Sequence, residues 1–184
     1  MSTVEQPDVR RARPGTVIWI TGLSGAGKSS VARHVVEWLA AGGQRPILLD
    51  GDEVRAVLGV TSGFDRDSRR RLALTYARLC RLLSEQGHVV VCATISLFRE
   101  VHEWNRAHLA GYFEVLLDVP AEELTRRNSK GLYGAGNAAR EVAGMDLDVD
   151  IPVRPDLVLR NSGEITAQVA AQRILDLCAK RYAW

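Results

Sequence analysis

The segment 22–29 has the sequence GLSGAGKS, which fits the G-x-x-x-x-G-K-[ST] spacing of a phosphate-binding loop. Glycines at these positions let backbone N–H groups turn towards phosphate oxygens. Lys28 can reach the β and γ oxygens of ATP and is expected to act in catalysis, while Ser29 offers a hydroxyl to Mg²⁺ at the start of a helix. The residues expected to contact the nucleotide are Gly22, Ser24, Gly25, Ala26, Gly27, Lys28, Ser29 and Ser30.

The sequence on both sides of this loop supports the interpretation. An apolar run at 17–20 is typical of a buried strand, and the apolar periodicity of 31–39 predicts a helix. A chance match in a flexible Gly/Ser loop would have neither element. The pattern therefore predicts a nucleoside triphosphate site.

A second group of chemically active residues follows the next apolar run, 46–49, which we expect to form a strand beside the phosphate loop. Asp50 and Asp52 come directly after it. Asp52 can accept a proton from a hydroxyl group or help to hold Mg²⁺, with Asp50 as its neighbour. The alternative is a capped helix start, with Asp52 as the N-cap of a helix over 53–58.

The elements that must position these residues alternate between strands and helices, which predicts an α/β fold with a five-stranded parallel sheet between two helical layers. Ligands of such sheets bind at the carboxyl ends of the strands. The strands are expected at 17–21, 46–49, 88–94, 113–118 and 156–159. The helices are expected at 28–41, 67–86, 99–110, 121–127 and 164–181.

The segment at about 129–153 follows neither periodicity and is rich in glycine. In a kinase with a phosphate loop, a long segment of this kind is expected to be a lid that excludes water from the site. Basic residues in or beside it could supply positive charge to the transferred phosphoryl group or could simply be solvated surface residues. They are Arg126, Arg127, Lys130 and Arg140.

Length and composition predict one kinase domain over 15–184, preceded by a disordered leader at 1–14. The 24 basic and 22 acidic side chains give a net charge of +2, which offers no case for nucleic-acid binding. No apolar stretch approaches the length of a membrane span. The cysteines Cys80, Cys92 and Cys178 are expected to be buried thiols, which is typical of a cytoplasmic protein.

The sequence at 49–55, LDGDEVR, resembles the adenylylsulfate kinase (APS kinase) family, whose pattern here is L-D-G-D-x-[VIL]-R. Further family motifs occur in the same order over about 16–178. They are Gly63-Phe64 followed by Arg69, Ile95-Ser96 followed by Phe98-Arg99, Lys130-Gly131-Leu132-Tyr133, and Asp150-Ile151-Pro152.

This resemblance implies a P-loop kinase, usually a homodimer, that transfers the γ-phosphoryl group of ATP to the 3′-hydroxyl of adenosine 5′-phosphosulfate (APS), giving PAPS. It implies that Arg55 and Arg69 bind the phosphosulfate and that Phe64 stacks on the acceptor adenine. The substrate-binding residues that it implies are Asp50, Arg55, Phe64, Arg69, Ile95, Ser96, Arg99, Lys130, Gly131 and Leu132. Catalysis is assigned to Asp52 and Lys28, and the metal to Ser29 and Asp52.

The chain departs from the family pattern on the acceptor side. Leu72 occupies the position of a family asparagine, and Val142 occupies that of a lid phenylalanine that completes the adenine stack. An aromatic stack on a base contributes on the order of 1–3 kcal/mol, so the second change is expected to weaken APS binding.

Three functions remain open from the sequence. The first is an APS kinase, and the second is a related kinase that phosphorylates another small alcohol in specialised metabolism. The third is a nucleotide-binding module without turnover, which is disfavoured because no N-K-x-D or D-x-x-G motif of a nucleotide switch follows the expected strands.

Overall fold

A computed structural model describes residues 14–60, 65–127, 149–161 and 165–182. Within these residues, five parallel strands form one sheet in the order β2-β3-β1-β4-β5. The strands are β1 (Thr16–Thr21), β2 (Ile47–Asp50), β3 (Val90–Ala93), β4 (Gly111–Asp118) and β5 (Leu157–Arg160). The predicted five-stranded parallel sheet is confirmed.

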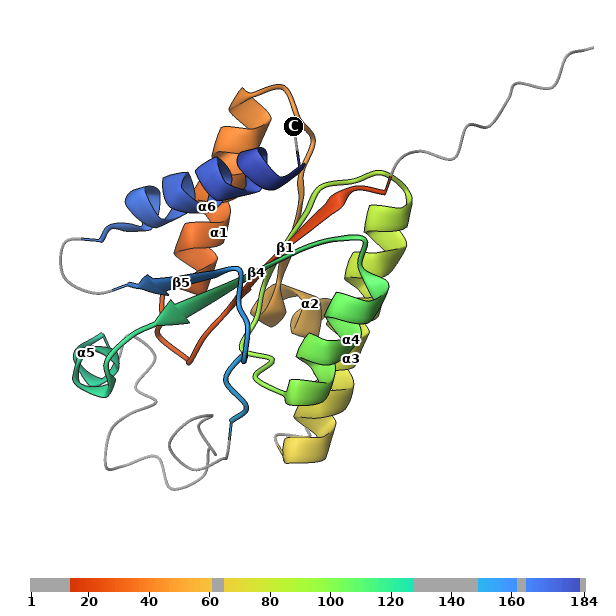
Figure 1. Cartoon of the computed structure of the whole chain (residues 1–184). Helices are drawn as coiled ribbons and strands as arrows, with labels where there is room; N and C mark the ends of the chain where they lie inside the picture. Colours follow the sequence, from red (N-terminus) through yellow and green to blue (C-terminus); the bar gives the residue numbers. More distant parts are fainter. Residues whose placement is uncertain (1–13, 61–64, 128–148, 162–164, 183–184) are drawn as a thin grey trace, which may run out of the picture.

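Helices cover both faces of the sheet, which completes the three layers (Figure 1). The helices α1 (Lys28–Ala41) and α6 (Ala167–Tyr182) pack together on one face, and α3 (Arg66–Glu85) and α4 (Arg99–His108) pack together on the other. Two short helices, α2 (Gly51–Val57) and α5 (Ala121–Arg126), follow the carboxyl ends of β2 and β4.

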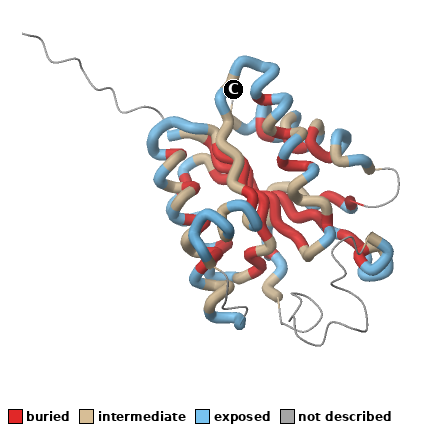
Figure 2. The backbone as a smooth tube through the Cα atoms, turned by 180° about the vertical axis from the view of Figure 1, so that it is seen from behind, coloured by how far each residue is buried: buried red, intermediate tan, exposed pale blue. Residues whose placement is uncertain are grey.

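The central strand β1 divides the core into two apolar clusters. All six of its residues are buried, as expected for a strand with neighbours on both edges and helices on both faces. Ile18 and Ile20 point into the cluster under α1 and α6, whereas Val17 and Trp19 point into the cluster under α3 and α4. Figure 2 shows the buried strands enclosed by helices whose outer faces are exposed.

The strand order corrects one expectation about the site. The strand that leads to Asp50 and Asp52 was expected beside the phosphate loop, but among the described strands β2 pairs with β3, and β3 pairs with β1. The chain passes from β1 through α1 to the edge strand β2 and then returns to β3. The two acidic residues therefore lie one strand further from the phosphate loop than predicted.

The three cysteines are buried thiols without disulfide bonds, as predicted. Burial raises the pKa of Cys178 to about 12 and, together with a hydrogen bond between the Cys92 and Cys80 thiols, raises that of Cys92 well above its ordinary value. In the described part of the chain, no helix is long and apolar enough to span a membrane.

A buried polar cluster joins α4 to the sheet on the α3 and α4 side. The Glu114 carboxylate, on β4, is 1% exposed and accepts hydrogen bonds from Tyr112 at 2.8 Å and from Arg106 at 2.7 Å. His102 Nδ1 lies 2.7 Å from the same carboxylate. Asp156, just before β5, accepts a bond from the Glu114 N–H at 2.8 Å. The carboxylates of Glu114 and Asp156 are therefore paired with hydrogen-bond donors where α4, β4 and β5 meet.

Candidate active site

The loop between β1 and α1 has the backbone conformation that a phosphate loop needs. Gly22, Gly25 and Gly27 have φ angles of +147°, +77° and +86°, which favour glycine. A Cβ atom on Gly22 would lie 2.6 Å from the carbonyl oxygen of Leu117, so a side chain has no room there. The glycines of the motif are thus required by geometry as well as by ligand access.

Helix α1 begins with N–H groups that point towards this loop. Its N-cap is Gly27, which provides no side-chain cap, and the first-turn N–H groups of Lys28, Ser29 and Ser30 have no acceptor within the helix. The Lys28 ammonium donates to the carbonyl oxygen of Leu23 at 2.7 Å, so it lies across the loop. These donors suit a bound triphosphate.

The donor set also suits Mg²⁺ held together with a nucleotide. Ser29 in the first turn of α1 and the exposed Asp52 carry side-chain oxygens, the kind of ligand that Mg²⁺ prefers. Among the residues described, no three His, Cys, Asp or Glu side chains are grouped closely enough to hold a metal ion. The phosphate oxygens would therefore have to complete the coordination.

Asn161 anchors the phosphate loop from the end of β5, and the sequence analysis missed it. Its side-chain amide donates to the carbonyl oxygen of Ala26 at 2.7 Å, and it is buried. A Cβ atom on Gly27 would lie 2.8 Å from the same amide nitrogen. The rule that ligands bind at the carboxyl ends of parallel strands could have pointed to this position.

The acidic turn after β2 is capped by a different aspartate from the one in the alternative drawn from the sequence. Asp50 is the N-cap of α2, since its carboxylate accepts the Asp52 N–H at 3.0 Å, and Asp50 is 5% exposed. The alternative in which Asp52 caps a helix over 53–58 is wrong, because Asp52 already lies in the first turn. The Asp52 carboxylate is exposed at the carboxyl edge of the sheet.

A buried tyrosine that the sequence did not reveal as a site residue lies beneath α2. The Tyr76 hydroxyl, from α3, donates to the carbonyl oxygen of Gly51 at 2.9 Å. Burial raises the pKa of Tyr76, and Arg55 opposes that shift through its charge and a hydrogen bond. An aromatic residue in the middle of a helix is usually core, so no sequence signal identified this one.

The residues after β3 connect α2 with the phosphate-loop strand. Ser96 has a φ of +26°, the one positive φ outside glycine in the described residues, and it is buried. Its hydroxyl lies 2.8 Å from that of Thr94. Thr21, at the end of β1, donates to the carbonyl oxygen of Ile95. Backbone strain of this kind concentrates at ligand sites.

The start of α4 is tied to the segment before β5. The Arg99 N–H and the Arg66 guanidinium both donate to one carboxylate oxygen of Asp150, each at 3.2 Å. The Arg99 side chain itself is exposed. Arg69 lies in the first turn of α3, and the starts of α3 and α4 lie at the same end of the molecule (Figure 1). Arg70, the next residue along α3, pairs with Glu100 of α4 at 2.6 Å and is partly exposed.

The two arginines at the end of α5 face different surroundings. Both bind Glu123, with distances of 2.7 Å from Arg126 and 2.6 Å from Arg127, and these bonds lower the pKa of Glu123 to about 2. The Arg126 side chain is 74% exposed, whereas that of Arg127 is 27% exposed. Arg127 comes within 4.0 Å of the Cβ position on Gly27, beside the phosphate loop.

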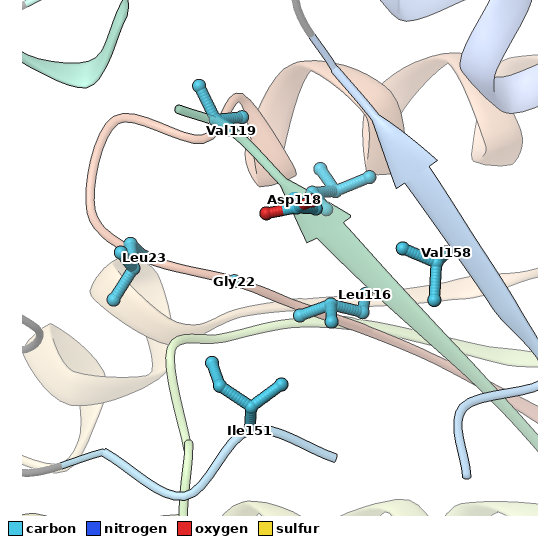
Figure 3. A pocket seen from close by; sticks show the side chains of 8 residues that line it. Gly22, Leu23, Leu116, Asp118, Val119, Ile151 and Val158 are labelled. Carbon is cyan, nitrogen blue, oxygen red and sulfur yellow. The ribbon is translucent and has the colours of Figure 1, made fainter. Parts of the chain in front are cut away.

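A pocket of about 230 Å³ opens beside the start of the phosphate loop (Figure 3). Its walls are mostly apolar side chains from the loop, the ends of β4 and β5, and the segment that leads into β5. The lining residues are Gly22, Leu23, Leu116, Leu117, Asp118, Val119, Ile151 and Val158.

The structure thus brings the phosphate loop, the start of α2 and the residues after β3 to one edge of the sheet. Several predicted site residues lie outside the described residues, as do most of the leader and of the lid. These residues are Phe64, Lys130, Gly131 and Leu132, together with Arg140 and Val142.

The comparisons with known proteins agree with this geometry. Residues 14–160 match the family described as adenylylsulphate kinase. The chain is 38% identical to the cytidine diphosphoramidate kinase of Campylobacter jejuni over 79% of its length and 86% of that protein. It is 37% identical to the adenylyl-sulfate kinase of Aeromonas hydrophila over 88% of its length and 84% of that protein.

A solved structure with similar architecture is the APS kinase of Mycobacterium tuberculosis in complex with AMPPNP and APS. The TM-score is 0.81 at 34% identity, and the match covers 89% of this chain and 97% of that one. Family, relatives and fold agree over most of the sequence. This chain therefore belongs to the adenylylsulfate kinase family and is an ATP-dependent phosphotransferase.

Proposed function

We propose that this kinase phosphorylates the 3′-hydroxyl of APS, giving PAPS and ADP in sulfate assimilation. The observation that carries the proposal is the common edge at which the phosphate loop, the acidic start of α2 and the strained residues after β3 meet. A nucleotide on the loop and an alcohol beside α2 would then be neighbours. The family membership supports APS as that alcohol.

In the proposed reaction, the acceptor oxygen forms a bond to the γ-phosphorus of ATP as the bond between that phosphorus and the bridging oxygen breaks. The leaving group is ADP. Asp52 either accepts the hydroxyl proton or helps to place the metal. Lys28 and the first-turn N–H groups of α1 bind the phosphate oxygens on which negative charge is concentrated.

Mg²⁺ bound with ATP would neutralise charge on the β and γ oxygens, and Ser29 and Asp52 are the residues proposed to hold it. Arg55 and Arg69, on α2 and α3, are proposed to bind the anionic groups of the acceptor. Arg127 lies beside the phosphate loop and is proposed to add positive charge near the nucleotide, in preference to the solvent-facing Arg126.

A second candidate acceptor is cytidine diphosphoramidate, because the relative from Campylobacter jejuni carries that name and is 38% identical. The departures from the family pattern favour it. Leu72 has no side-chain amide to offer an acceptor, and it is buried in the apolar cluster beneath α3. Val142 lacks the aromatic ring that would stack on an adenine.

The direct test is incubation of the protein with MgATP and either APS or cytidine diphosphoramidate, followed by mass spectrometry of the products. The proposal expects ADP and PAPS from the APS reaction. Phosphorylation of the cytidine compound alone would move the function to the second candidate. If ATP is consumed no faster with either acceptor than in a control without protein, both candidate functions are contradicted.

The Val142→Phe variant tests the acceptor pocket further. We expect it to tighten APS binding by about tenfold, because the ring restores a base stack worth on the order of 1–3 kcal/mol. The measurement is calorimetric titration of APS into both proteins with ADP and Mg²⁺ present. Tight wild-type binding that Phe does not improve would contradict a weakened APS site.

We also propose that residues 15–184 form one kinase unit that works as a cytoplasmic homodimer, as the family resemblance implies. Light scattering of the purified protein at several concentrations would test the dimer. A mass equal to one chain throughout would exclude it.

A further inference from the structure

Helix α2 carries the two side chains to which the proposed function gives most of the acceptor chemistry, Asp52 and Arg55. It is short, and none of its side chains is buried. Val54 is partly buried and packs against the cluster beneath α3. Hydrophobic burial alone therefore gives this helix little to fix its position, although phosphoryl transfer demands precise geometry.

Polar contacts at the first turn supply the missing constraint. The Asp50 carboxylate caps the helix internally, but this bond joins α2 only to its own strand. The Tyr76 hydroxyl reaches from the neighbouring helix α3 and donates to the carbonyl oxygen of Gly51 at 2.9 Å. Tyr76 is itself 4% exposed and packed among apolar residues, so its ring is fixed.

The same hydroxyl lies close to Arg55, one turn further along α2. The oxygen can accept a bond from the guanidinium while its hydrogen is donated to Gly51. On the other side, Gly51 is in contact with β3, since a Cβ atom there would lie 3.2 Å from the Thr94 hydroxyl and 3.3 Å from the Ala93 carbonyl oxygen. The first turn is thus held between α3 and β3.

We propose that Tyr76 is a positioning residue for the acceptor side of the active site. Its hydroxyl group holds the first turn of α2 and so orients Asp52 and Arg55. This rests on the proposed function for its catalytic consequence, but the restraint on α2 does not. The role requires the hydroxyl group. The aromatic ring alone would serve only packing.

The test uses the Tyr76→Phe variant of the full chain, with Tyr112→Phe as its matched control. Both tyrosines are 4% exposed and hydrogen-bonded through the hydroxyl, but Tyr112 bonds to Glu114 in the cluster between α4 and β4. Each protein is studied with MgADP by hydrogen exchange of the peptide 50–58. Turnover, acceptor KM, ADP affinity and melting temperature are measured alongside.

We expect Tyr76→Phe to exchange faster at 50–58, to lose about tenfold to a hundredfold in kcat/KM for the acceptor, and to keep the ADP affinity of the wild type. Tyr112→Phe should lower the melting temperature without either change. Unchanged exchange at 50–58 in Tyr76→Phe overturns the proposal. So does a variant that fails to fold, because the hydroxyl would then serve the fold as a whole.

The two proposals fail in different ways. If the wild type phosphorylates neither APS nor cytidine diphosphoramidate, the proposed function is wrong, and the exchange of 50–58 still decides whether Tyr76 restrains α2. If the wild type is active and Tyr76→Phe exchanges faster at 50–58 but has wild-type kcat and KM, the restraint has no catalytic consequence. That result overturns the positioning role alone.

Discussion

At the scale of single residues, Asp52 and Glu53 are neighbouring acids in the first turn of α2, and both are exposed. Only Asp52 matches the family motif, and only Asp52 is proposed to act in proton transfer or metal placement. We expect Asp52→Asn to lower kcat by about 10²-fold or more, the range for a lost general base. ADP affinity should change little. Steady-state kinetics and calorimetry with MgADP measure the two effects.

Glu53→Gln is the control for this prediction, because it removes the same charge from the same turn. It should keep wild-type turnover. Equal losses in both variants would mean that the charge of the turn matters rather than the Asp52 carboxylate. Full activity of Asp52→Asn would leave that carboxylate without a role in the reaction.

At the scale of elements, the phosphate loop depends on β5 as well as on its own glycines. Gly27 combines a φ of +86° with close contact to Asn161. Gly27→Ala should therefore weaken ADP binding by at least about tenfold. The added methyl group displaces the Asn161 amide, and an alanine in the left-handed conformation costs roughly 1–2 kcal/mol. Calorimetric titration with MgADP measures the change.

Gly43 provides a matched comparison for the Gly27 variant. Its φ is +85°, but a Cβ atom there would meet nothing within 4 Å. Gly43→Ala should lower the melting temperature slightly and leave ADP affinity as in the wild type. If both variants bind ADP equally well, the contact with Asn161 has no part in shaping the loop.

The elements themselves follow from local sequence to different degrees. β1 was predictable because a central parallel strand is a continuous apolar run, and the glycine spacing after it fixed the start of α1. Helix α2 was raised only as an alternative, with Asp52 as its N-cap, whereas the structure gives that position to Asp50. The reason is that either Asp50 or Asp52 satisfies the capping pattern, and only the end of β2 decides between them.

At the scale of the whole molecule, the burial of titratable groups is expected to lower the free energy of unfolding at alkaline pH. The pKa of Cys178 is raised by burial to about 12, compared with 9.0 for a free thiol. Up to about pH 9 the thiol is protonated in both states. Between pH 9 and 12 it ionises only in the unfolded chain, so folding stability falls by about 1.4 kcal/mol per pH unit.

Cys178→Ala should therefore be less stable at neutral pH, because it loses buried volume, but its stability should fall less steeply above pH 9. The expected difference in slope corresponds to one proton. Urea unfolding at pH 8.0, 9.5 and 10.5, followed by tryptophan fluorescence, measures it. Parallel curves for the two proteins would show that Cys178 does not contribute to the alkaline loss.

The sequence alone determined the fold class and the family, and it predicted a nucleotide site, because each depends on local patterns. Glycine spacing, an apolar strand and a Lys-Ser pair at a helix start carry their chemistry wherever the chain folds around them. The acidic turn after β2 and the run of family motifs were likewise readable in the order of residues. These local patterns do not determine which segments far apart in the sequence lie close together in space.

The tertiary structure decided which distant residues meet. The sheet order inserts β3 between the phosphate loop and the acidic turn, and it brings Asn161 and Arg127 to Gly27. Packing of α3 against the sheet brings the hydroxyl of Tyr76 under α2. Such contacts join residues that are far apart along the chain, so no local pattern in the sequence encodes them, and only the packing of helices on the sheet establishes them.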